Sequence, residues 1–300
     1  MRIATWNVNS LKQRLPKVTD WLAASRVDVL LMQETKLADE AAPEMAFRMV
    51  GYELAHHGEG RWNGVAIASR VGIAEVQRGL GTDPDPDGAR FVSAVCGGVR
   101  VASLYAPNGR QVGSEFWTAK LAWYARLRAW LDGRDPGEPL VIGGDFNVAP
   151  TDLDVWSPAA FVGATHVTVE ERAAFGSLLE WGLVDAYRLH HPEGGRFSWW
   201  DYRAGSFHKG EGMRIDHLLA TRPLVPRLTS ADIDREARKN PIPSDHAPVV
   251  VELADDAPGT ADEPGTADEL GAADELGTAD EPGAADTEMV IREAEGQPAS

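Results

Sequence analysis

The sequence predicts a mixed α/β fold, because short strand-like runs alternate with amphipathic helical segments throughout residues 1–253. The strand-like runs are rich in Val, Ile and Leu and are bounded by Gly, Pro, Asn or Asp, which is typical of strands buried in a sheet. The helical segments repeat apolar residues at intervals of three and four. Hydrophobic residues make up 43% of the 300 residues, so the chain can bury a large core.

The first part of the chain is predicted to contain two buried strands with a helix between them. These three elements cover, in order, residues 2–8, 16–24 and 27–33. Pro16 is expected near the start of the helix, and the second strand ends at Glu34. A further short helix is expected at 41–49. His56 and His57 fall in a segment rich in glycine and charge, so we expect them in an exposed loop and not as a metal-binding pair.

The rest of residues 1–253 continues this alternation. We expect strands at residues 64–69, 73–78, 91–96, 99–105, 140–142, 197–202, 213–220 and 249–253, and helices at residues 116–131 and 170–181. Within the aromatic segment 197–202, Trp199 and Trp200 must face opposite ways because successive side chains of a strand alternate. One of these rings can therefore lie in the core while the other lines a surface.

The stretch Leu140–Asn147 carries the clearest functional signal. Its apolar run ends at Gly143 and Gly144, and Asp145 and Asn147 follow at alternate positions, which places both side chains on one side of an extended segment. One alternative is a plain Gly-Asp turn with a local Asx turn at Asn147. The other is a strand end that delivers an acid and an amide to a water or a metal beside a phosphate.

Similar polar groups stand in or just after other strand-like segments. They are Asn7, Glu34, Tyr105, Asp216, Asp245 and His246. If these strand ends converge, they form a cluster of oxygen ligands with one imidazole, which suits Mg²⁺ or Mn²⁺ better than zinc. Asp216 inside a strand also needs a partner, because a buried unpaired charge is costly. The cluster predicts phosphate-ester hydrolysis, and no glycine-rich phosphate loop or dinucleotide fingerprint competes with it.

Charge and cysteine content limit the class of protein. The single cysteine, Cys96, excludes an internal disulfide framework and predicts a buried thiol in a reducing compartment. No apolar run is long enough for a signal region or a membrane span, so we expect a cytoplasmic protein. The net charge is −17, but the stretch from Ala254 onward carries −13 of it and residues 1–253 only −4. The charge balance of the body therefore does not exclude DNA as a partner.

The C-terminal stretch is predicted to be a disordered acidic tail. From Gly259 it repeats every six residues, beginning Gly-Thr-Ala-Asp-Glu-Pro, and it contains almost nothing to bury. We place the domain boundary near Leu253, which gives a catalytic domain at 1–253 and a tail at 254–300. The tail is either a solubilising extension or a tethered competitor of DNA for the basic face of the body.

Six short motifs together resemble the exonuclease III family of Mg²⁺-dependent apurinic/apyrimidinic endonucleases, within the endonuclease/exonuclease/phosphatase superfamily. In order they are Thr5–Asn9, Leu31–Lys36, Tyr105–Gly109, Gly144–Asn147, Arg214–Asp216 and Ser244–Pro248. The match covers residues 1 to about 253, and the acidic tail has no counterpart. The resemblance implies a four-layer α/β sandwich in which two packed mixed sheets are flanked by helices. It also implies a hydrolase of the exodeoxyribonuclease III type.

The resemblance implies roles for the residues at the strand ends. Glu34 is similar to the principal metal ligand of the family, with Asn7 and Asp245 close to the metal. Tyr105 and Asn108 resemble residues that support the phosphate.

The remaining implied roles concern the reaction itself. Asp145 resembles the residue that activates the attacking water, and Asn147 the residue that orients the water or the phosphate. His246 would contact the scissile phosphate while Asp216 holds its other ring nitrogen. The number of metals and the identity of the general base stay open.

Fold alone does not fix the substrate, because the superfamily includes enzymes for lipid, inositol-phosphate and RNA substrates. Trp199, Met213 and Ile215 resemble the wall of an abasic-sugar pocket, which accepts a flipped sugar without its base. The basic residues expected to contact the DNA backbone are Arg110, Lys120, Arg203, Lys209 and Arg214. We therefore expect a monomer that cuts duplex DNA 5′ of abasic sites and processes 3′ ends. The alternatives are a same-fold enzyme acting on RNA or another phosphate ester, and a non-catalytic DNA-binding protein.

Overall fold

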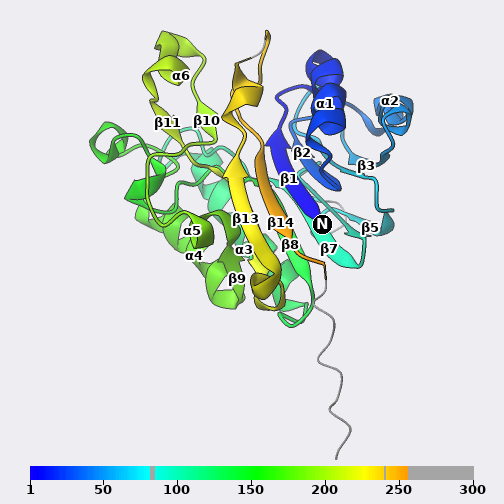
Figure 1. Cartoon of the computed structure of the whole chain (residues 1–300). Coiled ribbons are helices and arrows are strands. Elements are labelled where there is room, and N and C mark those ends of the chain that lie inside the picture. Colours follow the sequence, from blue (N-terminus) through cyan, green and yellow to red (C-terminus); the bar gives the residue numbers. More distant parts are fainter. Residues whose placement is uncertain (82–84, 240, 256–300) are drawn as a thin grey trace, which may run out of the picture. The chain divides into compact units, whose positions relative to one another are not determined.

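The computed structural model describes residues 1–81, 85–239 and 241–255, and most of its strands form two six-stranded sheets (Figure 1). In the first sheet the order is β13-β14-β1-β2-β4-β3, with β1 and β2 parallel and every other neighbouring pair antiparallel. Its strands are β1 (Arg2–Asn7), β2 (Val29–Gln33), β3 (Glu53–His57), β4 (Val65–Ser69), β13 (Leu228–Ile233) and β14 (Val249–Leu253).

The second sheet has the same pattern of directions. Its order is β5-β6-β7-β8-β12-β9, with β7 and β8 parallel and the other neighbours antiparallel. Its strands are β5 (Ala74–Arg78), β6 (Phe91–Cys96), β7 (Val99–Tyr105), β8 (Leu140–Asp145), β9 (Leu183–Asp185) and β12 (Asp216–Thr221). A separate antiparallel pair consists of β10 (Trp199–Trp200) and β11 (Gly212–Met213).

The main core lies between the two sheets. Ile3, Leu31 and Ile67 of the first sheet share one buried cluster with Val101 and Val141 of the second. The sheets approach closely at Gly143, where a Cβ atom would lie only 2.8 Å from Leu31 of the facing sheet and 2.5 Å from Leu218 of β12. A glycine is required there because any side chain would push the sheets apart.

Helices cover the outer faces of both sheets, which gives the four layers that the family resemblance implies. The helices are α1 (Leu11–Ser25), α2 (Glu44–Met49), α3 (Glu115–Asp132), α4 (Val169–Trp181), α5 (Ala186–His190) and α6 (Ser206–Lys209). Short 3₁₀ turns are η1 (Asp39–Ala41), η2 (Asp152–Asp154), η3 (Pro158–Phe161), η4 (Arg203–Gly205), η5 (Arg222–Arg227) and η6 (Arg235–Arg238). Leu22 of α1 packs against the first sheet. Trp123 of α3 and Phe175 of α4 pack against the second sheet. The predicted α/β sandwich is confirmed.

The predicted strand at 197–202 is reduced to Trp199–Trp200. Three other local predictions need correction. Helix α1 begins at Leu11 and has Pro16 inside it, because the backbone N–H groups of Ser10 and Leu11 bond to the carbonyls of Glu34 and Thr35 and so fix an earlier start. The predicted strand 213–220 is interrupted at residues 214 and 215, so that Asp216 begins β12 instead of lying inside it.

The predicted exposed loop at His56 and His57 is the third correction. Both residues belong to β3, and the His56 side chain is buried between Thr35 and Asp39. Its Nε2 lies 2.8 Å from the Thr35 hydroxyl and its Nδ1 lies 2.7 Å from the Asp39 carboxylate. These two partners allow the imidazole to be buried, although burial lowers its pKa.

Two remaining features concern the single cysteine and the membrane. Cys96 is buried, as predicted, and burial raises the pKa of its thiol to about 11. Within the described ranges, no helix combines the length and the apolar character that crossing a bilayer requires. The acidic tail lies outside the described residues, which end at residue 255, so the predicted boundary near Leu253 stays a prediction.

Candidate active site

Strand direction brings the predicted polar residues of the first sheet to one edge. Asn7 ends β1, Glu34 follows β2, and His246 precedes the antiparallel strand β14. The carboxyl ends of two parallel strands and the amino end of an antiparallel neighbour necessarily lie at the same edge. The second sheet repeats this arrangement with Asp145 at the end of β8 and Asp216 at the start of β12.

Two carboxylates, one from each sheet, meet at the centre of the site. The amide Nδ2 of Asn7 donates hydrogen bonds to Glu34 Oε1 at 2.8 Å and to Asp145 Oδ2 at 3.0 Å. Burial raises the pKa of Asp145 to about 7, and the charges of Asp216 and Glu34 act in the same direction, against the influence of His246.

His246 completes this group from the segment before β14. Its Nδ1 lies 2.8 Å from Asp216 Oδ2 and its Nε2 lies 3.7 Å from Asp145 Oδ2. Burial alone would lower the pKa of His246, but the carboxylates of Asp216 and Asp145 outweigh it and raise the pKa to about 10. Asp216 also accepts a 2.6 Å hydrogen bond from the Ser198 hydroxyl. The imidazole is therefore charged at neutral pH, and the predicted need of Asp216 for a partner is met.

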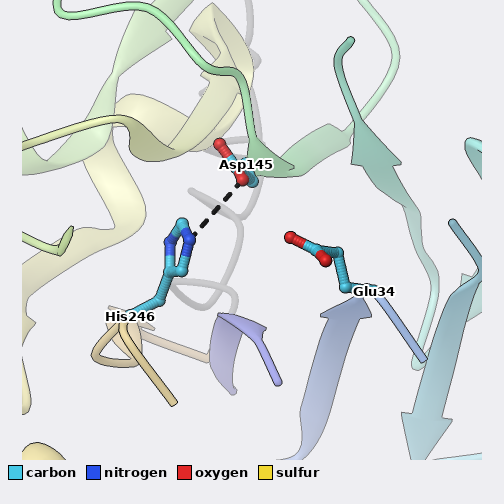
Figure 2. A group of neighbouring side chains, drawn as sticks. All are labelled: Glu34, Asp145 and His246. Carbon is cyan, nitrogen blue, oxygen red and sulfur yellow. Dashed lines mark ion pairs between the residues drawn. The ribbon is translucent and has the colours of Figure 1, made fainter. Parts of the chain in front are cut away.

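The donor set fits a metal ion. One ligand atom from each of Glu34, Asp145 and His246 lies within 4.8 Å of the other two, and Figure 2 shows the three side chains pointing into a common space. Buried carboxylates that repel one another are relieved by a cation, and oxygen ligands suit a hard divalent ion. Glu34 and Asp145 supply the oxygen ligands of this group and are the side chains that would hold the ion.

The other two predicted metal residues have different neighbours. The Asn7 amide nitrogen bridges the carboxylates, and its Oδ1 accepts from the backbone N–H of Asn9 at 3.0 Å. Asp245 lies outside the group of three, and its oxygens accept from Asn9 Nδ2 at 3.0 Å and from Trp199 Nε1 at 3.1 Å. Asn7 and Asp245 therefore contact other residues of the site through hydrogen bonds.

Sequence reasoning did not include Lys36 or Asn9 among the site residues. Lys36 Nζ lies 2.8 Å from Glu34 Oε2 and 2.6 Å from Asn9 Oδ1. The backbones of Glu34, Lys36 and Asn9 all have positive φ, which is uncommon for residues with side chains and clusters at functional sites. The sequence signal was present, since both residues lie two positions from a predicted ligand, but charge and polarity next to a strand end are usually only surface features.

The residues of the second sheet that are predicted to support the phosphate form a connected set. Asn147 is buried with φ of 52°; its Oδ1 accepts from Asn108 Nδ2 at 3.2 Å, and its backbone N–H donates to Asp145 Oδ1 at 2.9 Å. Tyr105 ends β7, and burial together with the nearby charges of Glu34 and Asp145 raises the pKa of its phenol well above its usual value. Tyr105 therefore stays neutral and can donate a hydrogen bond.

An apolar wall stands beside His246. Met213 and Ile215 are almost fully buried in a cluster with Val155, and Trp199 packs against this cluster with part of its ring exposed. Trp200, in contrast, is buried on the opposite side, as the alternation predicts. Trp199 pairs with His246 in an isolated bridge, which fixes the wall next to the charged centre.

The basic residues divide into exposed and buried ones. Arg110, Arg203 and Lys209 are exposed, whereas Lys120 and Arg214 are buried. Arg214 pairs with Asp154 at 2.7 Å and with Asp185 at 2.8 Å. A buried guanidinium between two carboxylates does not fit the predicted DNA contact, and the same holds for the buried ammonium of Lys120, so these two expectations are corrected. A cleft of about 420 Å³ lies beside Glu34 and Tyr105. The exposed Trp62 also lines this cleft, and sequence reasoning did not include it among the site residues.

Two packed mixed sheets whose strand ends hold paired acids, amides and a charged imidazole define a hydrolase with a metal-binding centre. The family model described as "Endonuclease/Exonuclease/phosphatase family" matches residues 4–246, and the chain belongs to this family, as a hydrolase of the exodeoxyribonuclease III and AP endonuclease type.

Several relatives match almost over their full length. Exodeoxyribonuclease III of Haemophilus influenzae is 32% identical, and the match covers 84% of this chain and all of the relative. The structure of an AP endonuclease from Archaeoglobus fulgidus is 37% identical with a TM-score of 0.82, covering 84% of this chain and 99% of that one. The 3′ phosphatase NExo from Neisseria, solved with a product DNA hairpin, is 39% identical with a TM-score of 0.82 over 84% of this chain and 99% of that chain.

Proposed function

We propose that this chain is a Mg²⁺-dependent DNA-repair phosphodiesterase that cleaves 5′ of abasic sites in duplex DNA and also processes 3′ ends. The observation that carries this proposal is the group of Glu34, Asp145 and His246, joined to Asp216 and set beside the apolar wall. The matching chains include an AP endonuclease and a 3′ phosphatase solved with DNA. Mn²⁺ is the alternative ion.

The two acids have separate tasks in the proposed reaction. Glu34 and Asp145 would hold Mg²⁺, which would supply a positive charge to stabilise the developing charge on the phosphate. Asp145 orients the attacking water and accepts its proton, a role for which its carboxylate in the group with Glu34 and His246 is placed. The Asn147 backbone N–H and the Asn7 amide fix the Asp145 carboxylate in place.

Several donors at the strand ends are proposed to contact the phosphate. His246 keeps its Nδ1–H on Asp216, so its Nε2–H can donate to a phosphate oxygen. Asn147, Asn108 and Tyr105 stand at the neighbouring strand ends and offer neutral donors to the same group. Preorganised donors aimed at developing charge are an effective form of catalysis.

The apolar wall supports the choice of an abasic substrate. Trp199, Met213 and Ile215 offer no partner for the polar edges of a base, while a bare sugar fits against them. The exposed Arg110, Arg203 and Lys209 are proposed to contact the DNA backbone. One chain already supplies the acids, amides and imidazole of the proposed centre, and we propose that it acts as a monomer.

The test uses a labelled duplex that contains one tetrahydrofuran abasic analogue, with the undamaged duplex and an RNA duplex of the same sequence as controls. We expect a single cut 5′ of the analogue in Mg²⁺ and none in EDTA. A recessed 3′-phosphate end serves as the second substrate, from which we expect release of phosphate. Cleavage of the RNA duplex without cleavage at the analogue would support the RNA alternative instead.

A further inference from the structure

A buried ion pair lies directly behind the proposed phosphate-binding residues. The Lys120 side chain of α3 and the Glu171 side chain of α4 are both fully buried, and Lys120 Nζ lies 2.6 Å from Glu171 Oε1. Buried ion pairs seldom stabilise a protein more than well-packed apolar residues of the same size would. The presence of this pair therefore calls for an explanation other than stability.

Two further hydrogen bonds of Lys120 go to the backbone of the site. Its ammonium donates to the carbonyl oxygen of Asn147 at 2.6 Å and, more weakly, to that of Asn108 at 3.4 Å. The same Asn147 carbonyl also accepts from His166 Nδ1 at 2.6 Å. One ammonium thus contacts both turns, the turn after β7 and the turn after β8, that carry the proposed phosphate donors.

Glu171 ties this ammonium to the start of α4. Its Oε1 accepts from the Thr165 hydroxyl at 2.6 Å, and its Oε2 accepts from the Thr168 hydroxyl at 2.8 Å within the capping box of the helix. The carboxylate is therefore held in place on both oxygens, and the cation that it pairs with cannot shift without breaking this set.

The turn that Lys120 contacts needs such support. Asn147 has φ of 52°, a left-handed conformation that is uncommon for residues with side chains and that asparagine tolerates better than most. Its side-chain amide must bond Asn108 and the carbonyl of Ala106 while its backbone N–H bonds Asp145. A small rotation of the Asn147 peptide would disturb all three contacts at once.

We propose that Lys120, charged and held by Glu171, is a positioning residue that sets the turns of Asn108 and Asn147 for the phosphate reaction. This inference rests on the proposed function, because the reaction that it positions is the phosphodiester cleavage. Because its side chain is fully buried behind the two turns, Lys120 acts on the reaction through them. Misplacement of reacting groups by about 1 Å costs on the order of 10² in rate. We therefore expect the loss of Lys120 to lower kcat and to leave KM nearly unchanged.

The main variant is the double substitution Lys120→Met with Glu171→Gln. It removes both charges together, so no charge is left unpaired. The Gln oxygen can still accept from Thr168 in the capping box, while its NH₂ group can donate to the hydroxyl oxygen of Thr165. We expect an unfolding temperature near that of the wild type, kcat on the abasic duplex lowered by roughly 10- to 100-fold, and KM changed by less than about threefold. A kcat within twofold of the wild type would overturn the inference.

Leu127→Ala provides the matched control. Leu127 is fully buried seven positions after Lys120 in the same helix α3, and its apolar side chain makes no hydrogen bond to either turn, so its truncation lowers stability by packing alone. We expect this variant to lose unfolding temperature yet to keep kcat at temperatures where it is folded. An equal fall of kcat in both variants would mean that Lys120 acts only through general stability.

Hydrogen exchange supplies a readout that needs no substrate. In the double variant, the amides of Ala106 and Asn147, which bond the backbone carbonyl and the side chain of Asp145, should exchange faster than in the wild type. In Leu127→Ala, the exchange rates of these two amides should rise no more than those of the other core amides. If the wild type cuts no abasic DNA, the proposed function fails, but unchanged exchange in the double variant overturns the positioning role whatever the substrate is.

Discussion

The two halves of the site have the same strand pattern but are supported differently. The half from the first sheet has partly exposed Glu34 and Asp245, and its polar side chains contact mainly one another. The half from the second sheet has buried Asp145, Asn147 and Asp216, and buried ion pairs lie behind it. We infer that the first half can adjust as a cation enters from solvent, whereas the second half holds the groups that act on water and phosphate in fixed positions.

The largest effect is expected in the second half. Asp145→Asn should lower kcat on abasic DNA by about 10² to 10⁴, since it removes the proposed proton acceptor, while DNA affinity changes little. Turnover and DNA binding are measured separately, by single-turnover cleavage and by titration without metal. Asp152→Asn, an exposed acid a few residues further along, is the control and should behave as wild type. Near-normal turnover in Asp145→Asn would remove this residue from the reaction.

Because the two halves are in contact, we expect the losses in log kcat from substitutions in each half to be non-additive. His246 belongs to the first half and Asp216 to the second, and their side chains lie 2.8 Å apart. We expect His246→Gln and Asp216→Asn each to lower kcat by about 10² or more, and the double variant to be little worse than either. The measurement is a double-mutant cycle in log kcat. Losses that add up fully would mean that the two residues act independently.

The first half should respond through metal affinity. Glu34→Gln keeps the shape of the side chain but removes its charge, so we expect the Mg²⁺ concentration for half-maximal activity to rise by at least about 10-fold. Calorimetric titration of the DNA-free protein with Mg²⁺ checks the same point without catalysis. Glu44→Gln in α2 is the control, because it removes only a surface charge. An unchanged Mg²⁺ titration would exclude Glu34 as a ligand.

The smallest effect concerns the acid sensitivity of the second half. Burial and the neighbouring Arg214 lower the pKa of His217 to about 4; its Nε2–H donates to the Val148 carbonyl. Because the unfolded chain takes up this proton near pH 6.5, the stabilising contribution is complete above pH 6.5 and is lost as the pH falls towards 4. It amounts to at most about 1.4 kcal/mol for each pKa unit.

His217→Gln isolates this contribution. A glutamine can donate to Val148 and accept from Arg214 without titrating, so urea unfolding of this variant should lose less stability between pH 6.5 and pH 4.5 than the wild type does. Substitution of an exposed histidine, His208→Gln, should leave the wild-type pH dependence intact. Parallel curves for wild type and His217→Gln would assign the acid sensitivity to other groups.

The sequence could predict the fold and the strand-end residues because the relevant signals are local. An apolar run that stops at an acid or an amide, as at Glu34 and Asp145, can be found without knowing the partner strands. The buried charges could not be predicted this way. Lys120 on an amphipathic helix looks like any solvated lysine, and its partner Glu171 lies 51 positions away in another helix. His56 is similar, since Asp39 and Thr35 become its neighbours only when β3 pairs with β4.

The pairing of β1 with β14 has a consequence for biosynthesis. These strands are among the first and the last of the described elements, and the amino group of Met1 donates to the carbonyl of Leu253 at 2.6 Å. Asn7 and Glu34 are therefore synthesised long before His246. Until β14 emerges, the nascent polypeptide lacks the imidazole and an inner strand of the first sheet, so a chain that stops early has no complete centre. Translation must pass residue 253 before this nuclease can acquire activity.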